Sequence, residues 1–176
     1  MNPTPLKRIV PFILLLLLAI LQATSLNRLS ILGIKPDLLL ILVIFLGLHK
    51  GPLSGAGYGF LAGVLLDIFS PAPLGTNALS KTVLGFLAGA VAPFLYFKAP
   101  FIQGLLLFLG MFLEGMILFI LLSSFHLAPP FCYSFLYIIL PASFYTSLLA
   151  PLFFYAFKRI TPVRSTSNGK VSSYAF

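Results

Sequence analysis

Three carboxylates are the residues of this chain that could carry acid–base, proton-transfer or metal chemistry. They are Asp37, Asp67 and Glu114, and they lie far apart in the sequence. Metal-assisted hydrolysis and phosphoryl transfer need several such groups around one ion, so the chain is poorly equipped for either reaction. The sequence also lacks the motifs of the phosphate-binding loop, the zinc-peptidase helix and the hydrolase nucleophile elbow. We therefore expect no enzyme activity.

Cysteine and histidine add no further chemistry. Cys132 is the single cysteine, which excludes a disulfide within the chain. His49 and His126 stand alone, whereas a metal site needs a cluster of ligands. We expect neither a metal nor a cofactor.

The composition predicts an integral membrane protein. Of the 176 residues, 60% are hydrophobic and only 8% are charged, against about 25% charged in ordinary soluble domains. The net charge of +8 comes from basic residues at the ends of apolar runs. This placement is typical of topology signals and lipid contacts, and not of nucleic-acid binding. We expect one membrane domain over residues 1–160 and a flexible polar tail over 161–176.

Six apolar runs predict an all-α, polytopic bundle of about six helices, with five spans as the alternative. A spanning helix needs about 20 residues, so the second run is short. Either the helices are tilted and irregular, or this run is a re-entrant element shielded by protein. The runs are Ile9–Thr24, Pro36–Leu48, Pro52–Phe69, Thr82–Phe97, Phe101–Leu122 and Tyr133–Phe157.

The distribution of basic residues predicts that both termini are cytoplasmic. With this orientation eight Lys and Arg residues fall inside and three fall outside, namely Arg28, Lys35 and Lys81. An alternative is that the first run is a signal peptide with a cleavage site near residues 23–25.

Glycine recurs every fourth residue in the third run, and the row ends in an acid. Successive positions drift by about 40° around a helix, so the row forms a ridge for a crossing helix and not a straight face. Small residues let membrane helices approach closely. We expect the third and fourth runs to cross there; a partner protein's helix is the alternative. The expected packing residues are Gly55, Gly59, Gly63, Gly85 and Gly89.

Asp67 lies in the last turn of the third run, where a carboxylate meets the unfavourable end of the helix dipole. It therefore needs a specific partner. The loop that follows contains two prolines, Gly75 and Asn77. We expect Asp67 to anchor this loop through hydrogen bonds and an ion pair, with Lys81, Arg28, Lys35 and Asn77 as possible partners. A binding site for a partner protein or small ligand is the alternative.

The other two acids have simpler expectations. Pro36 and Asp37 open the second run, where proline fits the first turn and an acid complements the helix dipole. Glu114 is the deepest acid, near the middle of the fifth run. Two interpretations of Glu114 are possible. It is either a protonated acid that is hydrogen-bonded to a neighbouring helix or part of a proton or substrate relay, and its role stays open.

Residues 35 to 90 resemble a known family. The Lys-Pro-Asp segment at 35–37, the run from Gly55 to Asp67, and Leu-Gly-Thr-Asn at 74–77 are similar to the rod shape-determining proteins of the MreD family. The matching positions are Pro36, Asp37, Gly59, Gly63, Asp67 and Gly75.

This resemblance implies a non-catalytic subunit of the bacterial cell-elongation machinery in the plasma membrane. The implied partners are the bitopic protein MreC, the peptidoglycan polymerase RodA with its transpeptidase, and indirectly MreB filaments. It also implies a fold similar to the six-helix substrate-binding subunits of energy-coupling-factor transporters. Such a transport subunit is the alternative function, and Ala19 and Ala23 give the spacing with which those subunits dock on their partner.

Overall fold

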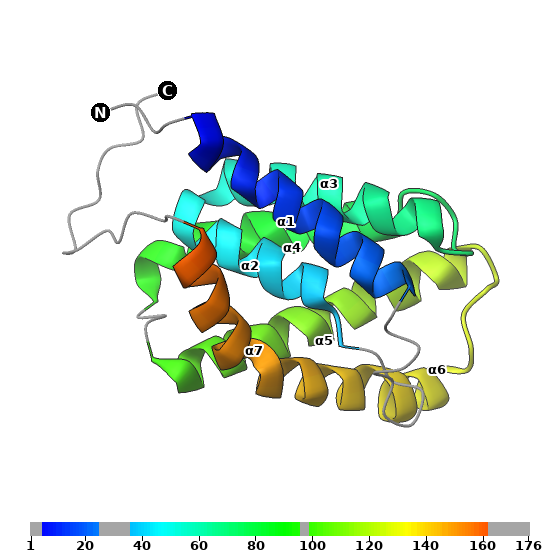
Figure 1. The fold of residues 1–176 in the computed structure, drawn as a ribbon. Helices are drawn as coiled ribbons and strands as arrows, with labels where there is room; N and C mark the ends of the chain where they lie inside the picture. Colours follow the sequence, from blue (N-terminus) through cyan, green and yellow to red (C-terminus); the bar gives the residue numbers. More distant parts are fainter. Residues whose placement is uncertain (1–4, 25–35, 96–98, 162–176) are drawn as a thin grey trace.

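The structure is a computed structural model that describes residues 5–24, 36–95 and 99–161 (Figure 1). The described residues form helices and connections without a strand, which confirms the all-α class. The polar tail after Thr161 lies outside them, as do Arg28 and Lys35. The helices are α1 (Pro5–Thr24), α2 (Leu38–Lys50), α3 (Pro52–Phe69), α4 (Thr76–Val91), α5 (Pro100–Ser124), α6 (Phe131–Tyr133) and α7 (Leu140–Ile160).

The helices form an up-and-down bundle. Helices α1, α3 and α5 run from the left to the right of Figure 1, and α2, α4 and α7 return. The start of α1 and the basic ends of α2 (Lys50) and α7 (Lys158, Arg159) therefore share one end of the bundle. Which side of the membrane this end faces stays a prediction.

Helix α2 is the centre of the bundle. Every residue from Leu38 to Leu48 is buried, because α1, α3, α4, α5 and α7 all pack around it. Thirteen residues span only about 20 Å, less than the hydrocarbon thickness of about 30 Å. The short second run is thus a regular helix shielded by protein on its sides.

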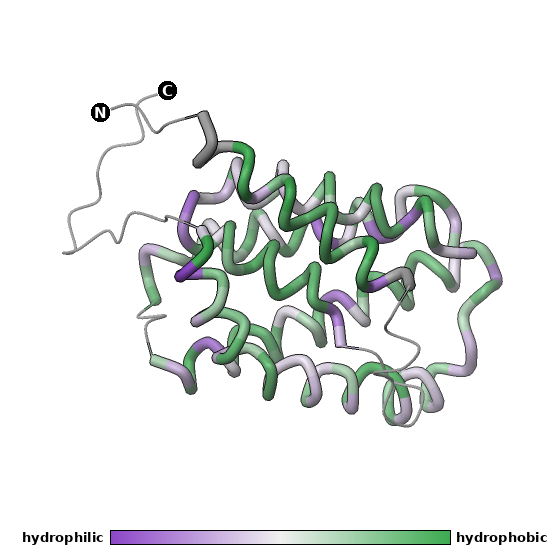
Figure 2. Tube along the Cα trace, viewed as in Figure 1, coloured by the Kyte–Doolittle hydropathy of each residue, from purple (hydrophilic) through white to green (hydrophobic). Residues whose placement is uncertain are grey.

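The outer helices expose apolar side chains, as expected of a protein that lies in lipid. Hydrophobic residues dominate every long helix in Figure 2. Within the described residues, three helical segments are long and apolar enough to cross a membrane: Pro52–Phe69, Pro100–Ser124 and Phe131–Ile160. The segments Ile9–Gln22 and Leu38–Lys50 are apolar but shorter. A total of six spans stays a prediction.

The fourth helix differs most from its expected bounds. It begins at Thr76, six residues before the apolar run, and ends at Val91, where the 3-10 turn η1 (Ala92–Phe94) follows. The apolar runs predict that Lys81 lies outside the membrane, before the fourth helix, because a lysine ends a run of high hydropathy. The structure places Lys81 inside the helix with 0% of its side chain exposed.

Helices α3 and α4 approach each other backbone to backbone through their glycines. A Cβ added to Gly55 would lie 2.8 Å from the carbonyl carbon of Gly85, and one added to Gly59 would lie 2.6 Å from that of Lys81. Real side chains do not tolerate such distances. Added Cβ atoms on Gly63 and Gly89 would meet the backbone of Ala78 and Pro52. These contacts form the expected crossing of the third and fourth runs.

The last helical segment is irregular near Pro141. Proline lacks an N–H group, and its ring clashes with the carbonyl four residues earlier. The preceding turns widen into the π-helical segment η2 (Ser134–Ile139), in which Leu140 N donates to Phe135 O. Regular α-helix resumes from there and carries Thr146 into the bundle.

Candidate functional site

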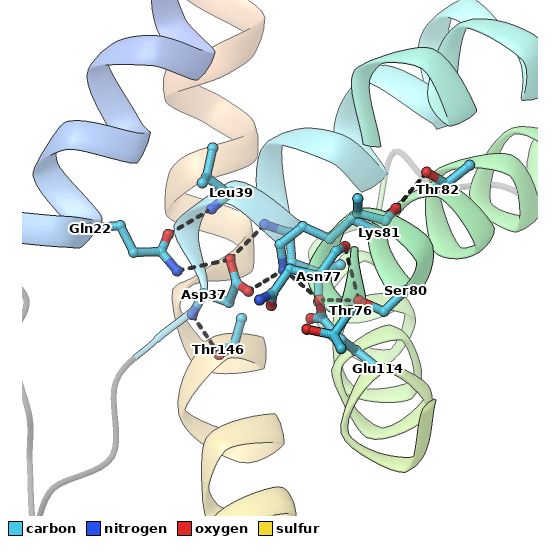
Figure 3. A network of polar contacts seen from close by, with 12 residues as sticks. Gln22, Asp37, Leu39, Thr76, Asn77, Ser80, Lys81, Thr82, Glu114 and Thr146 are labelled. Atoms are coloured by element: carbon cyan, nitrogen blue, oxygen red, sulfur yellow. Dashed lines mark hydrogen bonds and ion pairs between the residues drawn. The ribbon is translucent and has the colours of Figure 1, made fainter. Parts of the chain in front are cut away.

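A buried lysine joins two carboxylates from other helices. The ammonium of Lys81 on α4 donates to Oδ2 of Asp37 and to Oε1 of Glu114 on α5 (Figure 3). The Lys81 and Glu114 side chains are 0% and 2% exposed, and that of Asp37 is 13% exposed. Lys81, Asp37 and Glu114 are called the charge network below. These contacts connect α2, α4 and α5. Removing one partner would leave an uncompensated charge inside the bundle, which is strongly destabilising.

Asp37 is fixed by neutral groups as well. It is the N-cap of α2, and its Oδ1 accepts from Leu40 N at 2.8 Å. Gln22 of α1 donates to the same oxygen at 3.2 Å and accepts from Leu39 N at 3.2 Å. The backbone N–H of Asp37 donates to Thr146 Oγ1 of α7 at 3.4 Å. The network therefore reaches five helices.

Glu114 lies deep in the bundle and is only half satisfied. It is about 21 Å along α5 from Pro100 and about 15 Å from Ser124. Its Oε1 accepts from Lys81 and, at 3.5 Å, from Ser80 Oγ. Its Oε2 has no hydrogen-bond partner among the described residues.

The chemistry open to this arrangement is charge pairing and proton binding. Among the described residues no group of three or more His, Cys, Asp and Glu could hold a metal ion. The cation between the two carboxylates is the Lys81 ammonium itself.

Asp67 forms a second polar site, at the turn between α3 and α4. Its Oδ2 accepts from the backbone N–H groups of Gly75 at 2.9 Å and Ala78 at 3.1 Å. Its Oδ1 accepts from the backbone N–H of Asn77 at 3.1 Å and from the Asn77 amide at 2.9 Å. The carboxylate thus covers the positive N-terminus of α4, which offsets its unfavourable place at the end of α3.

We expect Asp67→Asn to destabilise this turn. An Asn amide presents a donor where one Asp67 oxygen now accepts backbone N–H groups, so a buried donor is left unpaired at a cost of about 1–3 kcal/mol. Faster protease cleavage of the folded protein within residues 70–76 would reveal the effect. Asn77→Ala is the comparison, because it removes one side-chain bond and leaves the backbone bonds in place. Equal cleavage of Asp67→Asn and the unmodified chain would contradict this account.

The structure brings some expected site residues together and separates others. Asp67, Gly75 and Asn77 meet at one turn, where Gly75 has a left-handed φ of 97° that favours glycine. Asp37 and Glu114 meet through Lys81, whereas Lys81 does not pair with Asp67. Pro36 is buried directly before the N-cap Asp37. Helix α2 begins at Leu38, so Pro36 does not lie in its first turn as expected.

Sequence reasoning missed the network as a unit. The hydropathy pattern pairs Glu114 with no other deep ionisable residue, because it places Lys81 on the outer side of the membrane. The available signal was helical continuity: extending the fourth run upstream to Thr76 places Lys81 one turn before Gly85 and inside the bundle. Gln22, Ser80 and Thr146 gave no signal of their own.

A comparison with protein families decides the class of protein. The sequence model described as rod shape-determining protein MreD matches residues 6–160. The chain belongs to the MreD family. As an MreD family member it is a membrane protein with a cell-shape role and is associated with the rod-shape complex. No curated protein and no solved structure matches it, so similarity to energy-coupling-factor subunits stays a prediction.

The structure shows what surrounds the positions that match the MreD family pattern. Asp37 belongs to the charge network, Asp67 and Gly75 to the turn before α4, and Gly59 and Gly63 to the α3–α4 crossing.

Proposed function

We propose that the chain is a non-catalytic, multi-pass subunit of the bacterial elongation complex in the plasma membrane, with both termini in the cytoplasm. It assembles with an MreC-like bitopic protein and the peptidoglycan synthases, and through them with MreB filaments. The observation that carries this proposal is the MreD family match over residues 6–160. Residues 1–160 form the membrane domain, and the polar tail from residue 161 has no assigned role.

The contacts of the three acidic side chains favour a role in assembly over a catalytic role. Asp37, Asp67 and Glu114 are all engaged by groups of the chain itself. The exposed faces are instead apolar; on α5 they carry Leu105, Leu109 and Leu113 at 45–48% exposure. Such faces contact lipid or the helices of other membrane proteins.

The alternative of a small-molecule transport subunit is not favoured by any described feature. Ala19 is fully buried inside the bundle, so it is not available for docking on a partner. Two open surface pockets of about 250 and 360 Å³ are lined almost entirely by apolar residues. A site for a polar vitamin would need several convergent polar groups.

Purification of the tagged chain in mild detergent tests the proposal. We expect an MreC-like bitopic protein to be recovered with it and to be absent when an unrelated tagged polytopic protein is purified in parallel. Recovery of a pair of ATPases together with a bound vitamin would contradict the proposal and favour transport.

A further inference from the structure

The charge network does not balance. Ionised Asp37 and Glu114 contribute two negative charges and Lys81 contributes one positive charge, which leaves one net negative charge among the described groups. The effective cost of burying an uncompensated ion is several kcal/mol. One further positive charge is needed in the same place.

The hydrogen bonds identify which carboxylate remains ionised. Both oxygens of Asp37 are occupied: Oδ1 accepts from Leu40 N and Gln22, and Oδ2 accepts from Lys81. The N-terminus of α2 also favours a negative charge on Asp37. Asp37 is thus built to be an anion.

Glu114 is different. Its Oε1 accepts two bonds, but its Oε2 is buried without a partner, and the residue is only 1% exposed. We propose that Oε2 of Glu114 binds a proton at neutral pH, so that the network is a neutral carboxylic acid beside a Lys81–Asp37 ion pair. This goes beyond the proposed function, because it concerns the ionisation of the isolated protein.

A proton fits this position better than a metal ion. The Lys81 ammonium already stands between the two carboxylates. Two of the packed helices bring only neutral groups to the network: Gln22 comes from α1 and Thr146 from α7. Among the described residues, the charged groups that face Glu114 are Lys81 from α4 and Asp37 from α2.

Infrared spectroscopy of the purified full chain detects the proton directly. We expect a carbonyl stretching band of a buried carboxylic acid at neutral pH that disappears in Glu114→Gln. The band should persist in Asp67→Asn, which alters a carboxylate outside the network. A spectrum without this band, or a band that Glu114→Gln leaves unchanged, would overturn the proposal.

Thermal unfolding provides a second and independent test. Gln has the shape of a protonated Glu and releases no proton on unfolding, so Glu114→Gln should keep or raise the unfolding midpoint of the unmodified chain at neutral pH, whereas Asp37→Asn should lower it. Unfolding releases the proton at any pH at which a free glutamic acid is ionised, so the unmodified chain should lose stability as the pH rises from the acidic range, until the folded chain releases the proton as well. Glu114→Gln should lack this loss. Equal destabilisation by Glu114→Gln and Asp37→Asn would show that Glu114 is ionised and would refute the assignment.

Variants of Arg28 and Lys35 serve as controls for another source of positive charge. Both residues are basic and lie outside the described residues. If the proton balances the network, Arg28→Met and Lys35→Met should leave the acid band unchanged. A band that appears only in one of these variants would identify that residue as the missing cation and overturn the proposal.

Discussion

Replacement of Lys81 with Met is expected to abolish accumulation of the folded protein. The change removes the cation from the charge network and leaves Asp37 and Glu114 facing each other in the bundle. Breaking a buried ion pair in this way costs about 3–5 kcal/mol, a large part of the about 5–15 kcal/mol that stabilises a typical folded protein. The yield of monodisperse protein after detergent extraction measures the effect.

Lys158→Met is the matched control, because it makes the same substitution at an exposed position near the end of α7. Its yield should stay near that of the unmodified chain. The triple variant Lys81→Met, Asp37→Asn and Glu114→Gln leaves no ionisable side chain in the network and should recover part of the lost yield. If Lys81→Met accumulated as well as Lys158→Met, the network would not stabilise the bundle.

A single added methyl group at Gly55 is expected to have the second largest effect. The new Cβ of Gly55→Ala would lie 2.8 Å from the Cα of Gly47 on α2 and 2.8 Å from the carbonyl carbon of Gly85 on α4. Backbone on both sides cannot rotate away, so the helices must separate. We expect a loss of at least about 1–3 kcal/mol, typical of an overpacked core, measured as a lower unfolding midpoint.

Gly57→Ala gives the opposite expectation on the same helix. No atom lies within 4 Å of a Cβ added at Gly57, and alanine favours a helix by about 0.8–1 kcal/mol over glycine. The midpoint of Gly57→Ala should therefore stay the same or rise. A similar fall for both variants would mean that intrinsic helix propensity, and not contact between helices, controls the result.

The sequence predicted the features that depend on local pattern. Long apolar runs predict helices, because a helix satisfies its own backbone hydrogen bonds in lipid. The structure confirms the all-α class. The spacing of Gly55, Gly59 and Gly63 indicated a close crossing, and the structure places α4 against it. The roles of these glycines and of Asp67 in the cell stay predictions.

The charge network could not be predicted in the same way, because it depends on contacts between distant residues. Lys81 and Glu114 are 33 positions apart, and Lys81 and Asp37 are 44 apart. A hydropathy profile assigns an isolated lysine an unfavourable energy and ends the helix there. Only the bundle shows that the ammonium binds the carboxyl groups of Asp37 and Glu114, which is why the start of α4 was expected six residues too late.

The burial of α2 has a consequence for how the protein is made. Synthesis completes α2 before the four later helices that pack against it, α3, α4, α5 and α7, have been made. During that interval a helix about 20 Å long, with Asp37 at one end, lacks its eventual neighbours. We therefore expect substitutions that disrupt α5 or α7 to leave the second helix misplaced in the membrane.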